Sequence, residues 1–516
     1  MESSLYELVV DMIDILLEGA DLKLDSATGV RASLNAVVKE ALALDRDRIF
    51  RETTADIPKP QVKYENSRTR PFRPNISEKP NAISPLDLCE LPVEDDEGHT
   101  TERPATFYPH PYEEELRAFG KNLYTKQPPY VVDSGYVRPV MPQGAALRPF
   151  AYIDTVEDLA TAAEEMEGFS ELAVDLEHHA YRSFQGITCL MQISTREKDY
   201  VLDAIILRQN LQAALLPLFT DPEIVKVFHG CDSDILWLQK DFGLYVVNCF
   251  DTYHAAKALR YPALSLAHLL KYHCGITLNK KHQLADWRIR PLPEDMLCYA
   301  RSDTHYLLYI YDCLRRDIYT AQGVSALLAV WMASMHTCLK RYEKEPFYPL
   351  GYTRLFTDSR GWSGAPAAVD VSPEQHIALA SLWSWRDSMA RREDESPLFI
   401  MSNAELLRIG RAIPLTEESL LECSPLSAFV RAHMNDLMET LLEPLRGAGS
   451  KLTETIPSQS SRLGHTSAAD DTNCSGGSGT SSTPVHTPGR VGLGAWSVQD
   501  ATRARHGQVK RLEGCV

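Results

Sequence analysis

The apolar positions of residues 151–330 alternate between the spacing of strands and the spacing of helices. Between the strand-like runs lie segments with helical spacing, including Leu207–Phe219. The strand-like runs are ELAVDLE (171–177), CLMQIST (189–195), DYVLDA (199–204) and VKVFHG (225–230). This alternation predicts an α/β layer with a mixed sheet.

The flanking parts of the chain have other patterns. Residues 1–50 show two helical patterns. Residues 51–150 are Pro-rich and contain one short helix near 110–124. Residues 372–445 have the rhythm of a small helical bundle. Residues rich in Ser, Thr and Gly follow, and they predict a disordered tail. We therefore divide the chain into an N-terminal segment (1–85), a linker (86–150), an α/β domain (151–330), a connector (331–371), a helical domain (372–447) and a tail (448–516).

Acidic residues and one tyrosine occupy three of the predicted elements. Asp175 and Glu177 are two residues apart on a predicted strand and so face the same way. Asp234 lies in the first turn of the helix predicted after VKVFHG, and Tyr299 and Asp303 share one face of a later helix. Carboxylate oxygens without thiolates favour Mg²⁺ or Mn²⁺ over zinc. The pattern predicts a site in which two ions, roughly 4 Å apart, assist displacement at phosphorus, with Tyr299 orienting or deprotonating the attacking water.

The order Asp-x-Glu, Asp, Tyr-x3-Asp resembles the signature of the DEDD-Y 3′→5′ exonucleases. The strings around these residues, such as VDLEHHAYRSFQGITCLMQISTREKDYVLDA and LADWRIRPLPEDMLCYARSDTHYLLYIYD, closely resemble the nuclear exosome-associated exoribonucleases related to RNase D. The resemblance covers residues 151–330 and implies a ribonuclease H-like fold. It also implies two metal ions held by Asp175, Glu177, Asp234 and Asp303, with Tyr299 assisting the water. Residues 372–447 look like an HRDC domain.

Further aromatic residues are candidates for binding the substrate. His178 is a candidate contact for the terminal nucleotide, and Trp237 either lines the site or packs in the core. Trp383 and Trp385 have helical spacing with apolar neighbours, so we expect at least one of them in a core rather than stacked on a base.

Composition narrows the function classes. Eleven cysteines without a C-x2-C pair disfavour zinc ribbons and a disulfide framework. The acidic N-terminus does not resemble a secretory signal, no apolar run is long enough to span a bilayer, and a phosphate-binding G-x4-G-K-[ST] string is absent. A net charge of −17 opposes strong general affinity for duplex RNA, so we expect partners to deliver the substrate.

The predicted function is metal-dependent removal of nucleoside 5′-monophosphates from RNA 3′ ends in the nucleus, including the nucleolus, with the RNA exosome. The alternatives are an exosome adaptor whose nuclease domain is only a scaffold, and a DNA 3′→5′ exonuclease. The wide apolar face of helix Leu5–Leu17 predicts that residues 1–85 dock a partner. The family resemblance implies a small helical cofactor protein in that place. A helical hairpin folded back on the nuclease domain is the alternative.

Overall fold

The structure is a computed structural model that describes residues 57–93, 102–278, 280–283, 285–357 and 371–448. The helices predicted in residues 1–50 and the tail predicted after residue 448 lie outside the described residues. Within the described part, no helix is long and apolar enough to cross a membrane.

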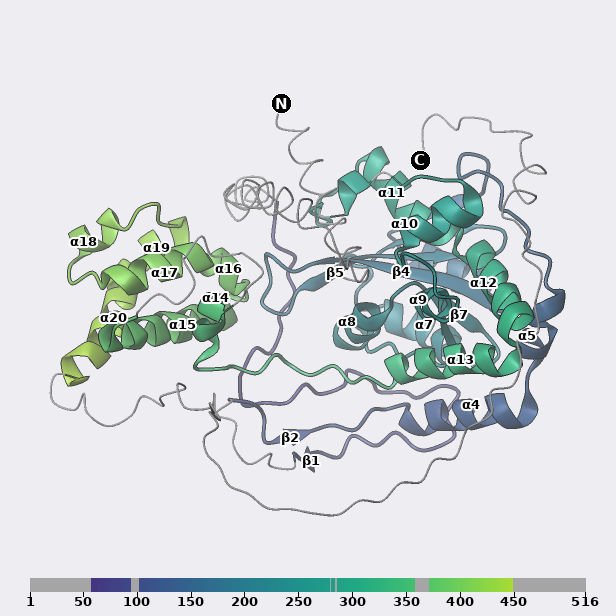
Figure 1. The fold of residues 1–516 in the computed structure, drawn as a ribbon, viewed down its shortest axis with the longest axis horizontal. Coiled ribbons are helices and arrows are strands. Elements are labelled where there is room, and N and C mark those ends of the chain that lie inside the picture. The colour runs from purple at the N-terminus through teal and green to yellow at the C-terminus, as the bar shows by residue number, and fades with distance from the viewer. Residues whose placement is uncertain (1–56, 94–101, 279, 284, 358–370, 449–516) are drawn as a thin grey trace, which may run out of the picture. The chain divides into compact units, whose positions relative to one another are not determined.

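A six-stranded mixed sheet forms the centre of the α/β unit, residues 150–338, and helices cover both of its faces (Figure 1). The strand order is β3-β6-β5-β4-β7-β8, in which β5 is antiparallel to both neighbours and the other pairs are parallel. The strands are β3 (Phe150–Ile153), β4 (Glu171–His179), β5 (Ile187–Ser194), β6 (Asp199–Asp203), β7 (Val225–Phe228) and β8 (Cys249–Asp251). The predicted α/β fold with a mixed sheet is confirmed.

The helices of this unit follow the strands closely along the chain. They are α6 (Val156–Glu167), α7 (Leu211–Thr220), α8 (Asp232–Phe242), α9 (Thr252–Ala258), α10 (Leu266–Leu269), α11 (Glu294–His305), α12 (Leu307–Gln322) and α13 (Val324–Cys338). Because strand side chains alternate between faces, Val174 and Leu176 of β4 enter the large core that α6 and α7 complete, whereas Asp175 and Glu177 point to the opposite face. Helix α11 covers that opposite face.

Two predicted boundaries of the α/β unit differ from the structure. Helix α13 continues through residue 330 to Cys338, because Trp331 and Met335 are buried in the same core as the sheet. The short helix predicted near 110–124, within the linker 86–150, is present as α4 (Glu113–Lys126). Both α4 and α5 (Pro129–Val132) contact α13, so this part of the linker packs on the α/β unit. A short hairpin of β1 (Leu91–Pro92) and β2 (Thr106–Phe107) precedes them.

The predicted helical bundle is present and has its own core. Its first long helix begins with a capping box, in which Ser372 and Gln375 bond each other's backbone N–H groups. Trp385 is buried there and donates a hydrogen bond to Asp436, so the prediction of a core tryptophan is confirmed. The segment 424–445, which the sequence predicts as one helix, is divided at His433 into two helices. The helices are α14 (Arg354–Thr357), α15 (Pro373–Glu393), α16 (Pro397–Ile400), α17 (Asn403–Ala412), α18 (Glu417–Glu422), α19 (Ala428–Ala432) and α20 (Met434–Ala448).

Residues 57–85, here called the strap, contact folded parts of the chain. The hydroxyl of Tyr64 donates to Asp241 of α8 at 2.6 Å, and Arg68 donates to Asp387 of α15 at 2.8 Å. The docking segment predicted at 1–85 therefore includes a stretch that already has partners within the chain. Its first 56 residues lie outside the described part.

Candidate active site

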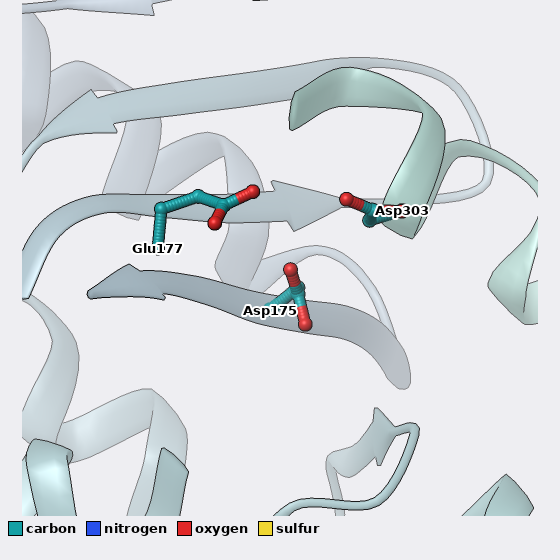
Figure 2. A group of neighbouring side chains, drawn as sticks. All are labelled: Asp175, Glu177 and Asp303. Atoms are coloured by element: carbon teal, nitrogen blue, oxygen red, sulfur yellow. The ribbon is translucent and has the colours of Figure 1, made fainter. Parts of the chain in front are cut away.

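Three of the predicted carboxylates converge on one face of the sheet (Figure 2). Asp175 and Glu177 come from β4, and Asp303 comes from α11, which lies across the strands. Each residue offers an oxygen, and these three atoms all lie within 4.8 Å of one another. Oxygen ligands at this spacing suit a divalent cation such as Mg²⁺ or Mn²⁺.

The fourth carboxylate, Asp234, reaches the same region from the neighbouring strand. β7 runs parallel to β4 and ends beside the middle of β4, and α8 begins just after β7, so the first turn of α8 lies near Asp175. Asp234 is buried in that turn, and the negative charge of Asp175 acts on it. It is outside the group of three that shares the 4.8 Å spacing, but it belongs to the same electrostatic cluster.

A buried carboxylate, Asp251, fixes the turn that carries Asp234. It accepts hydrogen bonds from the backbone N–H groups of Gly230 and Cys231, at 2.7 and 3.0 Å, and also caps α9 through Tyr253. Asp251 is not among the site residues predicted from the sequence. The available signal was its position as the last strand residue before a helix, where Asp is a common N-cap.

The four carboxylates together lack compensating positive charge. Burial raises the pKa of Asp175 to about 7. The pKa of Glu177 is raised well above its usual value, mainly by burial and to a smaller extent by the negative charges of Asp175, Asp303 and Asp234. The pKa values of Asp234 and Asp303 are raised by burial first and by Asp175 second. Among the described residues, none of the four pairs with a Lys or Arg. The donor set therefore fits a divalent cation, which would supply the missing charge.

Helix α11 is held in place by polar contacts on the turn that carries Asp303. Arg301 donates to Asp199 of β6 at 3.0 Å, and His305 bonds the same carboxylate at 2.7 Å. The hydroxyls of Thr304 and Ser194 are 2.8 Å apart. These contacts tie α11 to β5 and β6, and so they set the position of Asp303 relative to β4.

Tyr299 lies one helical turn before Asp303, as predicted. It is half-buried, and its ring centroid is 6.0 Å from that of His282 and 5.9 Å from that of Trp287. The ring is thus bordered by aromatic neighbours on the face of the sheet where the carboxylates gather.

The two predicted substrate contacts lie against each other. The rings of His178 and Trp237 are stacked, with centroids 4.1 Å apart and an angle of 2° between the planes. Gly186, at φ +70°, lies so close that an added Cβ would be 2.1 Å from the imidazole. Burial lowers the pKa of His178 to about 3, so the ring is neutral at physiological pH. Contact of either ring with a nucleotide stays a prediction.

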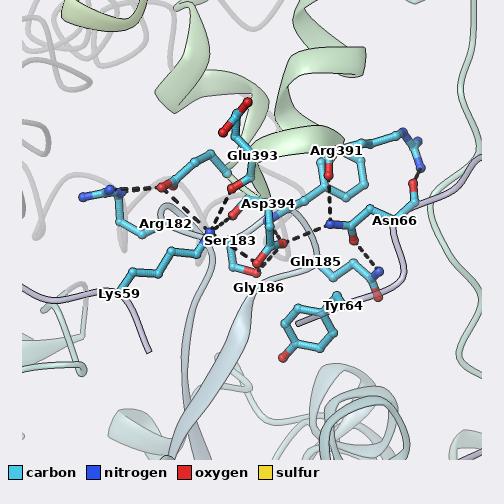
Figure 3. Close-up of polar contacts among 12 residues, drawn as sticks. Lys59, Tyr64, Asn66, Arg182, Ser183, Gln185, Gly186, Arg391, Glu393 and Asp394 are labelled. Atoms are coloured by element: carbon cyan, nitrogen blue, oxygen red, sulfur yellow. Dashed lines mark hydrogen bonds and ion pairs between the residues drawn. The ribbon is translucent and has the colours of Figure 1, made fainter. Parts of the chain in front are cut away.

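The turn between β4 and β5 is bound by residues distant in the sequence (Figure 3). The carboxylate of Asp394, which follows α15, accepts hydrogen bonds from the Ser183 hydroxyl and the Phe184 N–H at 3.3 and 3.1 Å. Asn66 of the strap donates to the same carboxylate at 3.1 Å, and Arg182 pairs with Glu395 at 3.0 Å. Strand β4, which carries Asp175 and Glu177, ends directly before this turn, so these contacts restrain its end.

Comparisons with known proteins agree with this geometry. Residues 150–319 match the family model described as 3′-5′ exonuclease, and residues 375–441 match the HRDC domain model. The chain is 38% identical over 509 residues to exosome complex component 10 of Homo sapiens, an alignment that covers 88% of this chain and 55% of the human protein. It is 37% identical over 457 residues to exosome complex exonuclease RRP6 of Saccharomyces cerevisiae, covering 86% of this chain and 59% of the yeast protein.

The chain thus spans a little over half the length of these curated relatives. Among solved structures, the catalytic core of RRP6 from Trypanosoma brucei superposes with a TM-score of 0.62 at 34% identity, covering 76% of this chain and 100% of that core. The chain aligns with the whole of that catalytic core, and its exonuclease and HRDC domain models match one after the other along the sequence. It therefore belongs to the Rrp6 and exosome component 10 family of 3′-5′ exonucleases that carry an HRDC domain.

Proposed function

We propose that this chain is a metal-dependent 3′→5′ exoribonuclease that releases nucleoside 5′-monophosphates. The observation that carries the proposal is the cluster of four half-buried or buried carboxylates, none of which pairs with a Lys or Arg in the described part of the chain, on the sheet face of a domain that matches 3′-5′ exonucleases. A site of this kind binds cations strongly because it is otherwise destabilised by its own charges.

Asp175, Glu177, Asp234 and Asp303 would hold two Mg²⁺ ions, with Mn²⁺ as a possible substitute. Bound there, the cations would stabilise negative charge on the oxygens of the phosphodiester during hydrolysis. Tyr299, one turn from Asp303, orients the attacking water and accepts or relays its proton. The stacked pair His178 and Trp237 offers a neutral aromatic surface next to β4, against which the terminal base packs.

The relatives suggest the biological setting. Those proteins are named as components of the exosome complex, and we propose that this chain likewise acts with the RNA exosome in the nucleus, including the nucleolus, on single-stranded 3′ ends in RNA processing and decay. Residues 1–85 would dock a small helical cofactor protein through the apolar face of the helix predicted at Leu5–Leu17.

One assay tests the reaction against the alternatives. Matched RNA and DNA oligonucleotides are incubated with the full chain in Mg²⁺ and in EDTA. We expect RNA to shorten from its 3′ end only in Mg²⁺. Faster cleavage of DNA than of RNA would favour a DNA exonuclease, and absence of cleavage of either in Mg²⁺ would favour a scaffold protein.

A further inference from the structure

Gln192 of β5 lies directly opposite Asp175 of β4 in the antiparallel pair. Residues opposed in this way point to the same face of the sheet, with Cβ atoms about 5 Å apart. The side chain of Gln192 therefore projects beside a predicted metal ligand. The sequence alone does not reveal this, because MQIS in β5 could pair with β4 in several registers.

The carboxamide of Gln192 is fully buried, and neither its nitrogen nor its oxygen has a hydrogen-bond partner among the described residues. Along β5, Leu190 contributes to the apolar cluster under α11, and Ser194 bonds Thr304 of α11. Gln192 lies between these two, under the turn of α11 that carries Asp303. On its other side is the apolar side chain of Val201 in β6.

A buried amide without partners is unfavourable, and in folded proteins such a group usually has a ligand, ion or water to satisfy it. An apolar residue of similar size would fit the surroundings formed by Leu190 and Val201. The polar side chain that the strand register places beside Gln192 is the carboxylate of Asp175, a ligand of the proposed metal site.

We propose that Gln192 is a positioning residue for that site. Its Nε2–H group donates a hydrogen bond to the carboxylate of Asp175 when that carboxylate binds a divalent cation. Its Oε1 atom then accepts a hydrogen bond from a water molecule in the site. The inference rests on the proposed metal site, and it extends that site to a fifth residue that does not itself touch the cation. Residues that orient metal ligands in this way typically raise metal affinity by roughly 10–100-fold.

The test is the substitution Gln192→Met, which keeps the length of the side chain and removes both hydrogen-bonding atoms. Mn²⁺ binding to the full chain is measured by the electron paramagnetic resonance of free Mn²⁺, and thermal unfolding is measured in EDTA. We expect the Mn²⁺ dissociation constant to rise at least about tenfold. In EDTA we expect an equal or higher melting temperature, since the variant no longer buries an unpaired amide.

A matched control is Thr220→Val at the end of α7, on the opposite side of the sheet. The buried hydroxyl of Thr220 donates to the Leu216 carbonyl at 2.7 Å and accepts from Asn81 at 3.0 Å. This variant removes a buried polar group that has its partners. It should therefore melt at a lower temperature in EDTA and bind Mn²⁺ with unchanged affinity.

The outcomes separate the inference from the proposed function. If the wild-type chain binds no Mn²⁺ at micromolar to millimolar concentrations, the metal site itself is wrong. If the wild type binds Mn²⁺ and Gln192→Met binds it equally well, only the role of Gln192 is overturned. A lower melting temperature of Gln192→Met in EDTA also overturns it, because Gln192 would then stabilise the metal-free fold. Gln192→Leu repeats the test if the methionine variant does not fold.

Discussion

Replacing Asp175 with Asn should stabilise the metal-free protein, and the gain should grow with pH. Burial raises the pKa of Asp175 from 3.8 to about 7. At a pH between these two values, the carboxyl therefore keeps a proton in the folded protein that it has released in the unfolded chain. Below the pKa that the carboxyl has in the unfolded chain, it is protonated in both states and does not destabilise the fold. Above its pKa in the folded protein, it is ionised in both states and its destabilising effect is complete. Asn has a similar shape and no charge, so the substitution removes this effect.

The magnitude follows from the two pKa values. A rise from 3.8 to about 7 corresponds to about 4 kcal/mol as an upper limit, present above pH 7 and absent below pH 4. Between pH 5.5 and pH 8, the stability difference between Asp175→Asn and the wild type should grow by about 2 kcal/mol. Burial lowers the pKa of His178 and His179, which therefore destabilise the fold at acidic pH, but both proteins contain them and their effect cancels in the difference.

The assay is urea unfolding of both proteins in EDTA at a series of pH values. Asp241→Asn is the matched control, because Lys240 and Arg208 hold the pKa of this buried carboxyl well below its usual value. That variant should lose stability at pH 8, opposite in sign to Asp175→Asn. Two results would contradict our account of the metal site: Asp175→Asn being less stable than the wild type in EDTA at pH 8, or a stability gain that does not vary with pH. Either would mean that the ionised carboxylates do not destabilise the metal-free fold.

Three further predictions concern catalysis and the N-terminal region. Tyr299→Phe should lower kcat by roughly 10²–10⁴ with little change in KM, measured by steady-state kinetics, and a change in KM alone would make Tyr299 a binding residue. RNA ending in a 3′-phosphate should be degraded more slowly than RNA with a free 3′-hydroxyl, because the added charge lies next to the acidic cluster; equal rates would contradict an exonuclease. Deleting residues 1–56 should leave melting temperature and hydrolysis of short RNA unchanged, whereas deleting 1–85 should lower the melting temperature, because it removes the contacts of Tyr64 and Arg68. Equal losses in the two deletions would place the first 56 residues in the catalytic core.

The elements that carry the candidate site residues could be predicted from the sequence because their signals are local. Asp175 and Glu177 share a face through the two-residue period of a strand, and Tyr299 and Asp303 share one through helical spacing. Asp234 follows a buried strand at the start of a helix, which is also readable along the chain. The family signature joined these three local patterns into one site.

The features that the sequence did not reveal depend on contacts between distant residues. The position of Gln192 beside Asp175 follows from strand register, and the stacking of His178 on Trp237 follows from the packing of α8 near β4. The strap has little periodicity, so its binding to α8 and α15 through specific side chains such as Tyr64 could not be predicted. Hydrophobic pattern identifies elements, but it does not identify which polar side chains meet between them.

The central claim is metal-dependent hydrolysis at the four-carboxylate site, and the most direct test is product analysis with wild type and Asp234→Asn. RNA labelled at its 5′ end is incubated with each protein in Mg²⁺, and released nucleotides are identified by chromatography. We expect the wild type to shorten the RNA stepwise and release nucleoside 5′-monophosphates. Asp234→Asn should bind RNA but work at least about 100-fold more slowly, since a charged ligand is lost while the side-chain shape is kept. A near-normal rate for Asp234→Asn, or internal cleavage by the wild type, would contradict the account.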